Sequence, residues 1–232
     1  MILDLIQNPV ITTFGILLFI AGLIFSISFH EFSHAKSAQL MGDKTPEYQG
    51  RVTLNPLAHL EPVGLLALLV FPFGWGKPVQ VNPDNMGLYP ERKYFISSIV
   101  GPLSNIFLCF VIFLITWVYT IIFSSNNFGI NRSDLSSIYI VFQLLFSLNL
   151  TLAFFNLIPI PPLDGSKIWP IILPSNIREK VEPFIFKYGI FLLLLLVFPI
   201  IPSGNGTTSL VNILISPGIN FITDNVFHFF LI

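Results

Sequence analysis

Charge and cysteine are the two features that this sequence of 232 residues has least of. Charged residues make up only 10% of the chain, against about 25% in soluble domains, so a soluble surface cannot be built from them. The 11 Lys and Arg are balanced by 12 Asp and Glu, which excludes the concentrated basic face that nucleic acid binding requires. The single cysteine, Cys109, excludes an internal disulfide framework and a cysteine zinc cluster, and we expect it in the core.

Long apolar runs take the place of the missing charge, and they predict an all-α polytopic membrane protein. Four runs are long enough, or nearly so, to cross a hydrocarbon core of about 30 Å as helices. They cover about residues 10–40, 94–123, 135–158 and 185–201. A cleaved signal peptide is the alternative for the first run, but Asp4 precedes it without any Lys or Arg, and no small-residue cleavage site follows.

Three further segments are predicted to be structured without crossing the membrane as single helices. Residues 63–76 are interrupted by Pro72 and Gly74 and are too short to cross, which favours a re-entrant segment. Residues 47–54 have some β character and predict a strand in the same inner loop. The tail, residues 202–232, contains Pro217-Gly218 and predicts an interfacial or partly inserted hairpin, so we expect a core over residues 1–201.

Lysine and arginine are distributed unevenly among the predicted loops. All but one of them lie near the loop between the first and second spans or between the third and fourth. The exception is Arg132, between the second and third spans. Because cytoplasmic loops carry the excess of Lys and Arg, we expect both termini outside and the two basic loops in the cytoplasm.

The inner end of the first predicted span reads His30-Glu31-Phe32-Ser33-His34, an H-E-x-x-H pattern. Positions i and i+4 of a helix lie on one face, so both imidazoles can bind one metal ion. Glu31 is offset from that face but can reach a water molecule activated by the ion and take its proton. Two histidines that merely cap a helix end are the structural alternative, which is costly in an apolar span. A serine protease using Ser33 and His34 fails because neighbouring helix residues point in different directions.

Two histidines leave a catalytic zinc one protein ligand short. Asp164 is the favoured third ligand because it follows the third span on the same predicted side, where the prolines of residues 159–162 open the backbone. Taken alone, Asp164 would be interpreted as part of a turn or as a helix N-cap. Among the other histidines, we expect a structural hydrogen bond for His59, while His228 lies in the tail on the opposite side.

Three ordered segments carry a family resemblance. They are residues His30 to Ala35 in the first span, Gly101-Pro102-Leu103-Ser104-Asn105 in the second, and Asn156 to Gly165 (NLIPIPPLDG) at the end of the third. These segments, together with residues 50–56 and 74–79, resemble the motifs of compact members of the site-2 protease family of intramembrane zinc metalloproteases. The likeness covers about residues 10–175. The loops are too short for the inserted PDZ or CBS domain of larger members.

The resemblance implies a three-helix catalytic core that holds one zinc ion, with His30, His34 and Asp164 as ligands and Glu31 as general base. It also implies that Asn156 binds the substrate backbone or orients the site. The alternative for Asn156 is an interhelical hydrogen bond with a polar group such as Asn105. Asn105 itself is expected to be a packing residue near Gly101, with substrate binding or site orientation as its other role. Residues 50–54 could pair with an unfolded substrate as an added strand.

The predicted function is hydrolysis of peptide bonds within or near transmembrane segments of membrane proteins. We expect a multi-pass protein of the lipid bilayer, in a bacterial inner membrane, with its active site towards the cytoplasm. A non-catalytic metal-binding membrane protein or a metal transporter could use the same ligands, because ionisable residues in a membrane also mark ion pathways. Glu31 favours catalysis, since a transport site does not require a base beside the two histidines.

Overall fold

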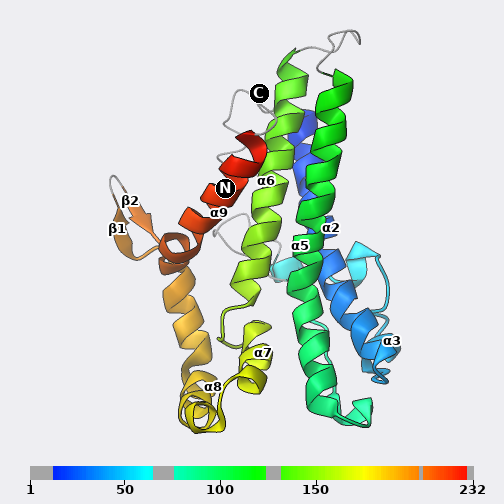
Figure 1. Ribbon diagram of the computed structural model, residues 1–232, viewed down its shortest axis with the longest axis vertical. Coiled ribbons are helices and arrows are strands. Elements are labelled where there is room, and N and C mark those ends of the chain that lie inside the picture. Colours follow the sequence, from blue (N-terminus) through cyan, green and yellow to red (C-terminus); the bar gives the residue numbers. More distant parts are fainter. Residues whose placement is uncertain (1–12, 65–75, 124–131, 204–205, 229–232) are drawn as a thin grey trace.

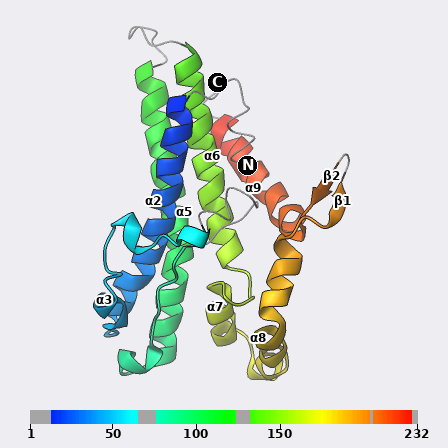
Figure 2. The same cartoon turned by 180° about the vertical axis from the view of Figure 1, so that it is seen from behind.

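Three long helices form the centre of the molecule, and they confirm the all-α class (Figure 1). The computed structural model describes residues 13–64, 76–123, 132–203 and 206–228. The central helices are α2 (Thr13–Leu40), α5 (Pro90–Phe123) and α6 (Arg132–Asn156). They lie side by side when seen from the front and from behind (Figures 1 and 2). They correspond to the predicted runs at 10–40, 94–123 and 135–158.

Close packing holds the N-terminal half of α2 against the middle of α6. Phe19 of α2 and Val141 and Leu145 of α6 form one buried apolar cluster. Gly22 permits this approach, since a Cβ atom there would lie 2.7 Å from the side chain of Leu145. Small residues at helix crossings let backbones approach each other, which is the usual way for helices to associate in lipid.

Four described helices are long and apolar enough to cross a membrane. They are α2, α5, the Ser137–Asn156 part of α6, and α9 (Leu210–His228). Large apolar side chains such as Phe107 and Trp117 of α5 are exposed on the outside of the bundle. An apolar exterior of this kind suits lipid rather than water, so the chain is a multi-pass membrane protein.

The chain after residue 174 differs from the prediction. The run at 185–201 belongs to α8 (Ser175–Val197), which begins ten residues before that run and carries several charges in its first turns, so it is not among these four helices. A short antiparallel pair, β1 (Ile201–Ser203) and β2 (Gly206–Thr208), follows. The hairpin predicted in the tail is wrong, because Pro217-Gly218 lies inside the continuous helix α9. Ile219 and Phe227 pack α9 against Phe146 and Leu150 of α6, and this burial outweighs the turn preference of Pro-Gly.

The inner loop between α2 and α5 is made of short turns. It contains the helix α3 (Thr45–Tyr48) and two 3-10 turns, η1 (Pro56–Ala58) and η2 (Pro83–Met86). The strand predicted at 47–54 is wrong: α3 occupies its first residues, and Gly50 turns the chain with a φ of +67°. The free protein therefore offers no strand over 47–54 for a substrate to extend. The re-entrant segment predicted at 63–76 lies mostly outside the described residues.

The proline-rich turn after α6 leads into α7 (Gly165–Ile172). Prolines cannot continue a helix, so α6 ends at Asn156 and the backbone opens. The indole of Trp169 donates to the carbonyl of Leu157 at 2.8 Å and ties α7 back to this turn. Gly165 is required there, because a Cβ atom would overlap the carbonyls of Leu157 and Ile158. This turn fixes the position of Asp164, directly before α7.

Candidate metal centre

His30 and His34 lie one helical turn apart on α2, as their spacing predicts. Their Nε2 atoms are 3.1 Å apart, and their rings meet edge to face with centroids separated by 4.7 Å. Both side chains are buried against α5. Neither ring therefore lies at an exposed helix end, which removes the interpretation of the pair as simple caps.

Asp164 reaches both histidines from the proline-rich turn. Its Oδ2 lies 3.2 Å from Nε2 of His30 and 2.9 Å from Nε2 of His34. These three atoms are a candidate metal ligand set. Ligand atoms bound tetrahedrally to zinc at about 2.0–2.1 Å lie about 3.3 Å apart, so the observed triangle is close to the size that zinc needs.

The hydrogen bonds of the two rings test whether a metal fits this triangle. Nδ1 of His34 is 2.7 Å from the carbonyl oxygen of Ser97, which can only accept, so Nδ1 carries a proton. In its neutral form, the ring then directs the lone pair of Nε2 at the carboxylate of Asp164 and at the other ring. Lone pairs that converge in this way repel each other, and a cation bound by all three atoms removes that repulsion. The donor set, two imidazoles and one carboxylate, suits zinc.

Gly101 provides the space in which the two rings lie. A Cβ atom at this position would overlap the imidazole of His34 and come within 2.9 Å of Cε1 of His30. Pro102, inside α5, is likewise fully buried. The Gly-Pro pair of the second motif therefore lets α5 pass directly over the candidate metal ligands.

Glu31 lies beside the ligand triangle and is not part of it. Its side chain is half-buried, and its Oε2 accepts a hydrogen bond from the backbone N–H of Val79 at 3.0 Å. Val79 belongs to the extended segment that follows the bridge between Leu60 and Gly76. One carboxylate oxygen is thus held by the inner loop, and the offset from the ligand face agrees with the sequence prediction.

Comparison with known proteins identifies the family. The family model of peptidase family M50 matches residues 18–196, most of the chain. The chain belongs to peptidase family M50. It is 36% identical over 174 residues to "Putative zinc metalloprotease YwhC" of Bacillus subtilis, covering 75% of this chain and 77% of that protein.

Two further relatives of this M50 chain carry names of the same form. MJ0611 of Methanocaldococcus jannaschii is 32% identical, over 67% of this chain and 72% of its own length. Rip2 of Mycolicibacterium smegmatis is 31% identical, over 64% of this chain and 54% of its own length. No solved structure matches the chain at comparable significance. The predicted membership of the site-2 protease family is confirmed, and the names of these relatives specify zinc as their metal.

The M50 motif after α6 brings a cation to the site that the sequence prediction missed. Nζ of Lys167, in the first turn of α7, lies 3.2 Å from Oδ1 of Asp164, the carboxylate oxygen that does not face the histidines. Burial would lower the pKa of Lys167, but the negative charges of Asp164 and, to a smaller extent, Glu31 raise it above its usual value. Its spacing of three residues from Asp164 on a helix was the available signal.

The two asparagines of the prediction lie in different surroundings. Asn105 is fully buried, and its Oδ1 lies 2.6 Å from Nδ1 of His30, which supports an orienting role. Its amide donates to Asn149 of α6 at 3.0 Å, so Asn149 makes the interhelical bond that was the alternative for Asn156. Asn156 instead donates to the carbonyl of Leu152 in its own helix at 2.9 Å. Asn149 and Asn156 lie about two turns apart on the same face of α6, and Asn149 is the one level with Asn105.

The remaining histidines and the cysteine lie where the sequence predicts. His59 is buried, and its Nε2 donates to the carbonyl of Thr53 at 2.8 Å, a structural hydrogen bond. His228 is exposed at the last turn of α9 and does not belong to the ligand triangle. Cys109 is buried in the cluster between α5, α6 and α9.

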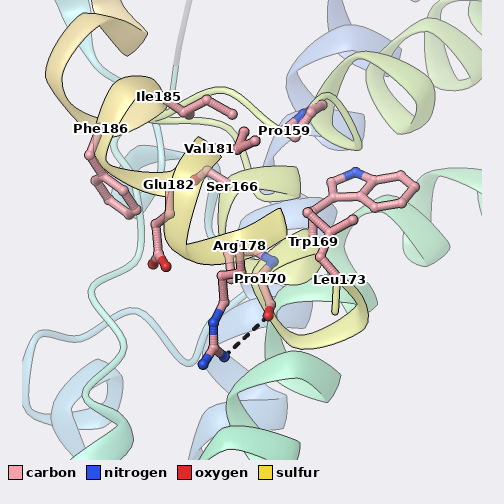
Figure 3. A pocket seen from close by; sticks show the side chains of 10 residues that line it. All are labelled: Pro159, Ser166, Trp169, Pro170, Leu173, Arg178, Val181, Glu182, Ile185 and Phe186. Atoms are coloured by element: carbon pink, nitrogen blue, oxygen red, sulfur yellow. Dashed lines mark hydrogen bonds between the residues drawn. The ribbon is translucent and has the colours of Figure 1, made fainter. Parts of the chain in front are cut away.

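A separate, mostly apolar pocket lies between α7, α8 and the proline-rich turn (Figure 3). Trp169 of α7 and Val181 of α8 line it, and Arg178 donates to the carbonyl of Pro170 at 3.4 Å. None of the three metal ligands lines it. The triangle of His30, His34 and Asp164 therefore lies apart from this pocket.

Proposed function

We propose that this M50 metalloprotease is an intramembrane endopeptidase that cuts other membrane proteins within or near their transmembrane segments. One observation carries the proposal. The triangle of His30, His34 and Asp164 lies at the inner end of an apolar helix long enough to cross a membrane, with the carboxylate of Glu31 beside it. A site at this depth is reached by a substrate that is itself in the membrane.

Each residue of the site has a distinct task in this proposal. Zinc, when bound by the triangle, supplies a Lewis acid that polarises a carbonyl and acidifies water. Glu31 takes the proton of the attacking water and passes it to the leaving amine, acting first as base and then as acid. The N–H of Val79 holds one oxygen of Glu31, which leaves the other for this proton. Asn156 stays a candidate for contact with the substrate backbone, through its amide oxygen.

Orientation is part of the proposal. The start of α2 and the end of α9 lie towards one end of the bundle, while α3 and α7 lie towards the other (Figures 1 and 2). By the positive-inside rule, the α3 and α7 end faces the cytoplasm and both termini lie outside. The membrane we propose is a bacterial inner membrane. A helical substrate must unwind locally before hydrolysis, because its carbonyls are hydrogen-bonded within the helix.

The proposal is tested by reconstituting the protein in vesicles with a pool of single-span membrane proteins from the same organism. New termini are identified by mass spectrometry for the wild type, Glu31→Gln and Asp164→Ala. We expect cleavage by the wild type only, with zinc retained by Glu31→Gln. A zinc-loaded wild type that cuts no member of the pool, or equal cleavage by Glu31→Gln, would contradict the proposal. The first result would favour a metal-binding or transport protein.

A further inference from the structure

A row of buried polar side chains crosses the three central helices and ends on a metal ligand. The amide of Asn149 on α6 donates to the hydroxyl of Ser26 on α2 at 3.0 Å. The amide of Asn105 on α5 donates to Oδ1 of Asn149 at 3.0 Å. Oδ1 of Asn105 then meets Nδ1 of His30 at 2.6 Å. Both asparagines are 0% exposed.

Buried amides need an explanation in a helix bundle of this kind. A buried amide costs free energy unless its hydrogen bonds are made, whereas a leucine at either position would pack without that requirement. Polar contacts between membrane helices contribute only about 0.6 kcal/mol on average. Stabilisation of the bundle is therefore a weak reason for two fully buried asparagines, and their connection to His30 is a stronger one.

The direction of these hydrogen bonds is fixed at the end remote from His30. Nδ2 of Asn149 also donates to the main-chain carbonyl of Leu145 at 2.8 Å, and a carbonyl can only accept. Asn149 must therefore turn its amide nitrogen to Leu145 and its oxygen to Asn105. Asn105 must therefore donate from its amide nitrogen to Asn149, which leaves its oxygen to accept from His30. Because Oδ1 of Asn105 can only accept, Nδ1 of His30 must carry the proton. In the neutral ring, Nε2 then keeps its lone pair.

We infer that Asn149 is a positioning residue of the metal centre, acting through Asn105. The carbonyl of Leu145 selects the tautomer of His30 through the two amides and so presents Nε2 to the metal. In His34, the carbonyl of Ser97 fixes the proton on Nδ1 directly. Both histidines therefore carry the proton on Nδ1, one through a main-chain carbonyl and the other through two side-chain amides. This inference rests on the proposed metal ligands.

A double-mutant cycle separates this role from a purely structural one. In Asn149→Leu, the amide of Asn105 is free to turn over, and zinc should bind about 10–100-fold more weakly, the usual loss for an outer-shell partner. In Asn105→Asp, both side-chain oxygens accept, so His30 keeps its proton on Nδ1 whatever lies at position 149. Asn149→Leu should then cause no loss of zinc affinity in the Asn105→Asp background.

The readout is the zinc dissociation constant, measured by competition with a chelator on protein in detergent, together with the absorption spectrum of the Co²⁺ form. Thr151→Val is the matched control, because Thr151 also lies on α6 and bonds only to a carbonyl of its own helix, that of Ser147 at 2.8 Å. It should leave both readouts unchanged. If Asn149→Leu cannot be purified, Asn149→Ser takes its place in the cycle.

An equal loss of affinity in both backgrounds, or no loss in either, would overturn the inference. Both outcomes leave the proposed function standing as long as the wild type binds zinc. A wild type that binds no zinc would overturn the metal ligands and the inference together.

Discussion

The carboxylate of Asp164 lies 2.9 Å from the imidazole of His34, although the two residues are 130 positions apart in the chain. Two features of the sequence permit this contact. The prolines after α6 open the backbone so that Asp164 turns towards α2. Because Gly101 has no side chain, α5 can pass close to the two histidines at this position. The metal centre therefore depends on three separate segments meeting at one point.

Substitution of Gly101 tests the close approach of α5. In Gly101→Ala, the new methyl group would displace the ring of His34, so zinc affinity should fall by more than about tenfold. Zinc competition with a chelator measures the effect. Gly218→Ala in α9 is the control, since no atom lies within 4 Å of a Cβ there, and the change should be neutral or slightly stabilising. Equal zinc affinity for Gly101→Ala and wild type would count against the packing described.

Lys167 should influence catalysis through Asp164. Its ammonium binds Oδ1, which keeps Oδ2 directed at the histidines. Lys167→Met should lower the cleavage rate by about tenfold, the lower end of losses for outer-shell partners, while Lys167→Arg keeps the charge and much of the rate. Zinc content should change less than the rate, because removal of the cation also removes its repulsion of the metal. Identical cleavage rates for the three proteins would refute this role.

Removal of zinc should destabilise the fold. A ligand that binds only the folded state raises the melting temperature in proportion to its binding free energy. A chelator should therefore lower the melting temperature of the wild type in detergent and leave that of Asp164→Ala nearly unchanged. An equal shift in both proteins would mean that the chelator acts elsewhere.

Asp43 gives a prediction for pH. Its carboxylate accepts hydrogen bonds from the N–H and hydroxyl of Thr45, the amide of Asn85 and the N–H of Asn82. Burial raises the pKa of Asp43, but these hydrogen bonds lower it below its usual value overall. Such a group stabilises the fold above its unfolded pKa of about 3.9, and this contribution is lost as the pH falls through the folded pKa.

Asp43→Asn should therefore be less stable than the wild type at pH 7, by about 1–3 kcal/mol for the donors left unpaired. The difference should shrink as the pH falls below about 4, where the wild-type carboxylate becomes protonated. Thermal unfolding of both proteins in detergent, at pH 7 and below about pH 4, measures this difference in stability. A difference that is the same at both pH values would show that the charge of Asp43 does not contribute.

The sequence was sufficient to predict the parts of the site that depend on local geometry. The H-E-x-x-H spacing places both histidines on one helix face whatever the rest of the chain does. Asp164 could be inferred because the topology puts the end of the third span on the same side as those histidines. The family resemblance indicated the same three candidate ligands.

The rest depended on information that an apolar sequence does not contain. Asn149 and Asn156 are seven residues apart and so lie on the same face of α6, about two turns apart along its axis. Nothing in the sequence indicated which of them lies level with Asn105. Lys167 was missed because its approach to Asp164 requires α7 to begin at Gly165. The tail was mistaken for a hairpin because Pro217-Gly218 is a turn signal that the packing of α9 on α6 overrides.

The most direct test of the metal centre is the zinc content of detergent-purified protein, measured by mass spectrometry for wild type, Glu31→Gln and Asp164→Ala. We expect about one zinc per chain in the wild type, the same in Glu31→Gln, and a clear reduction in Asp164→Ala. Zinc-free wild type after mild purification, or full zinc content in Asp164→Ala, would contradict this ligand set.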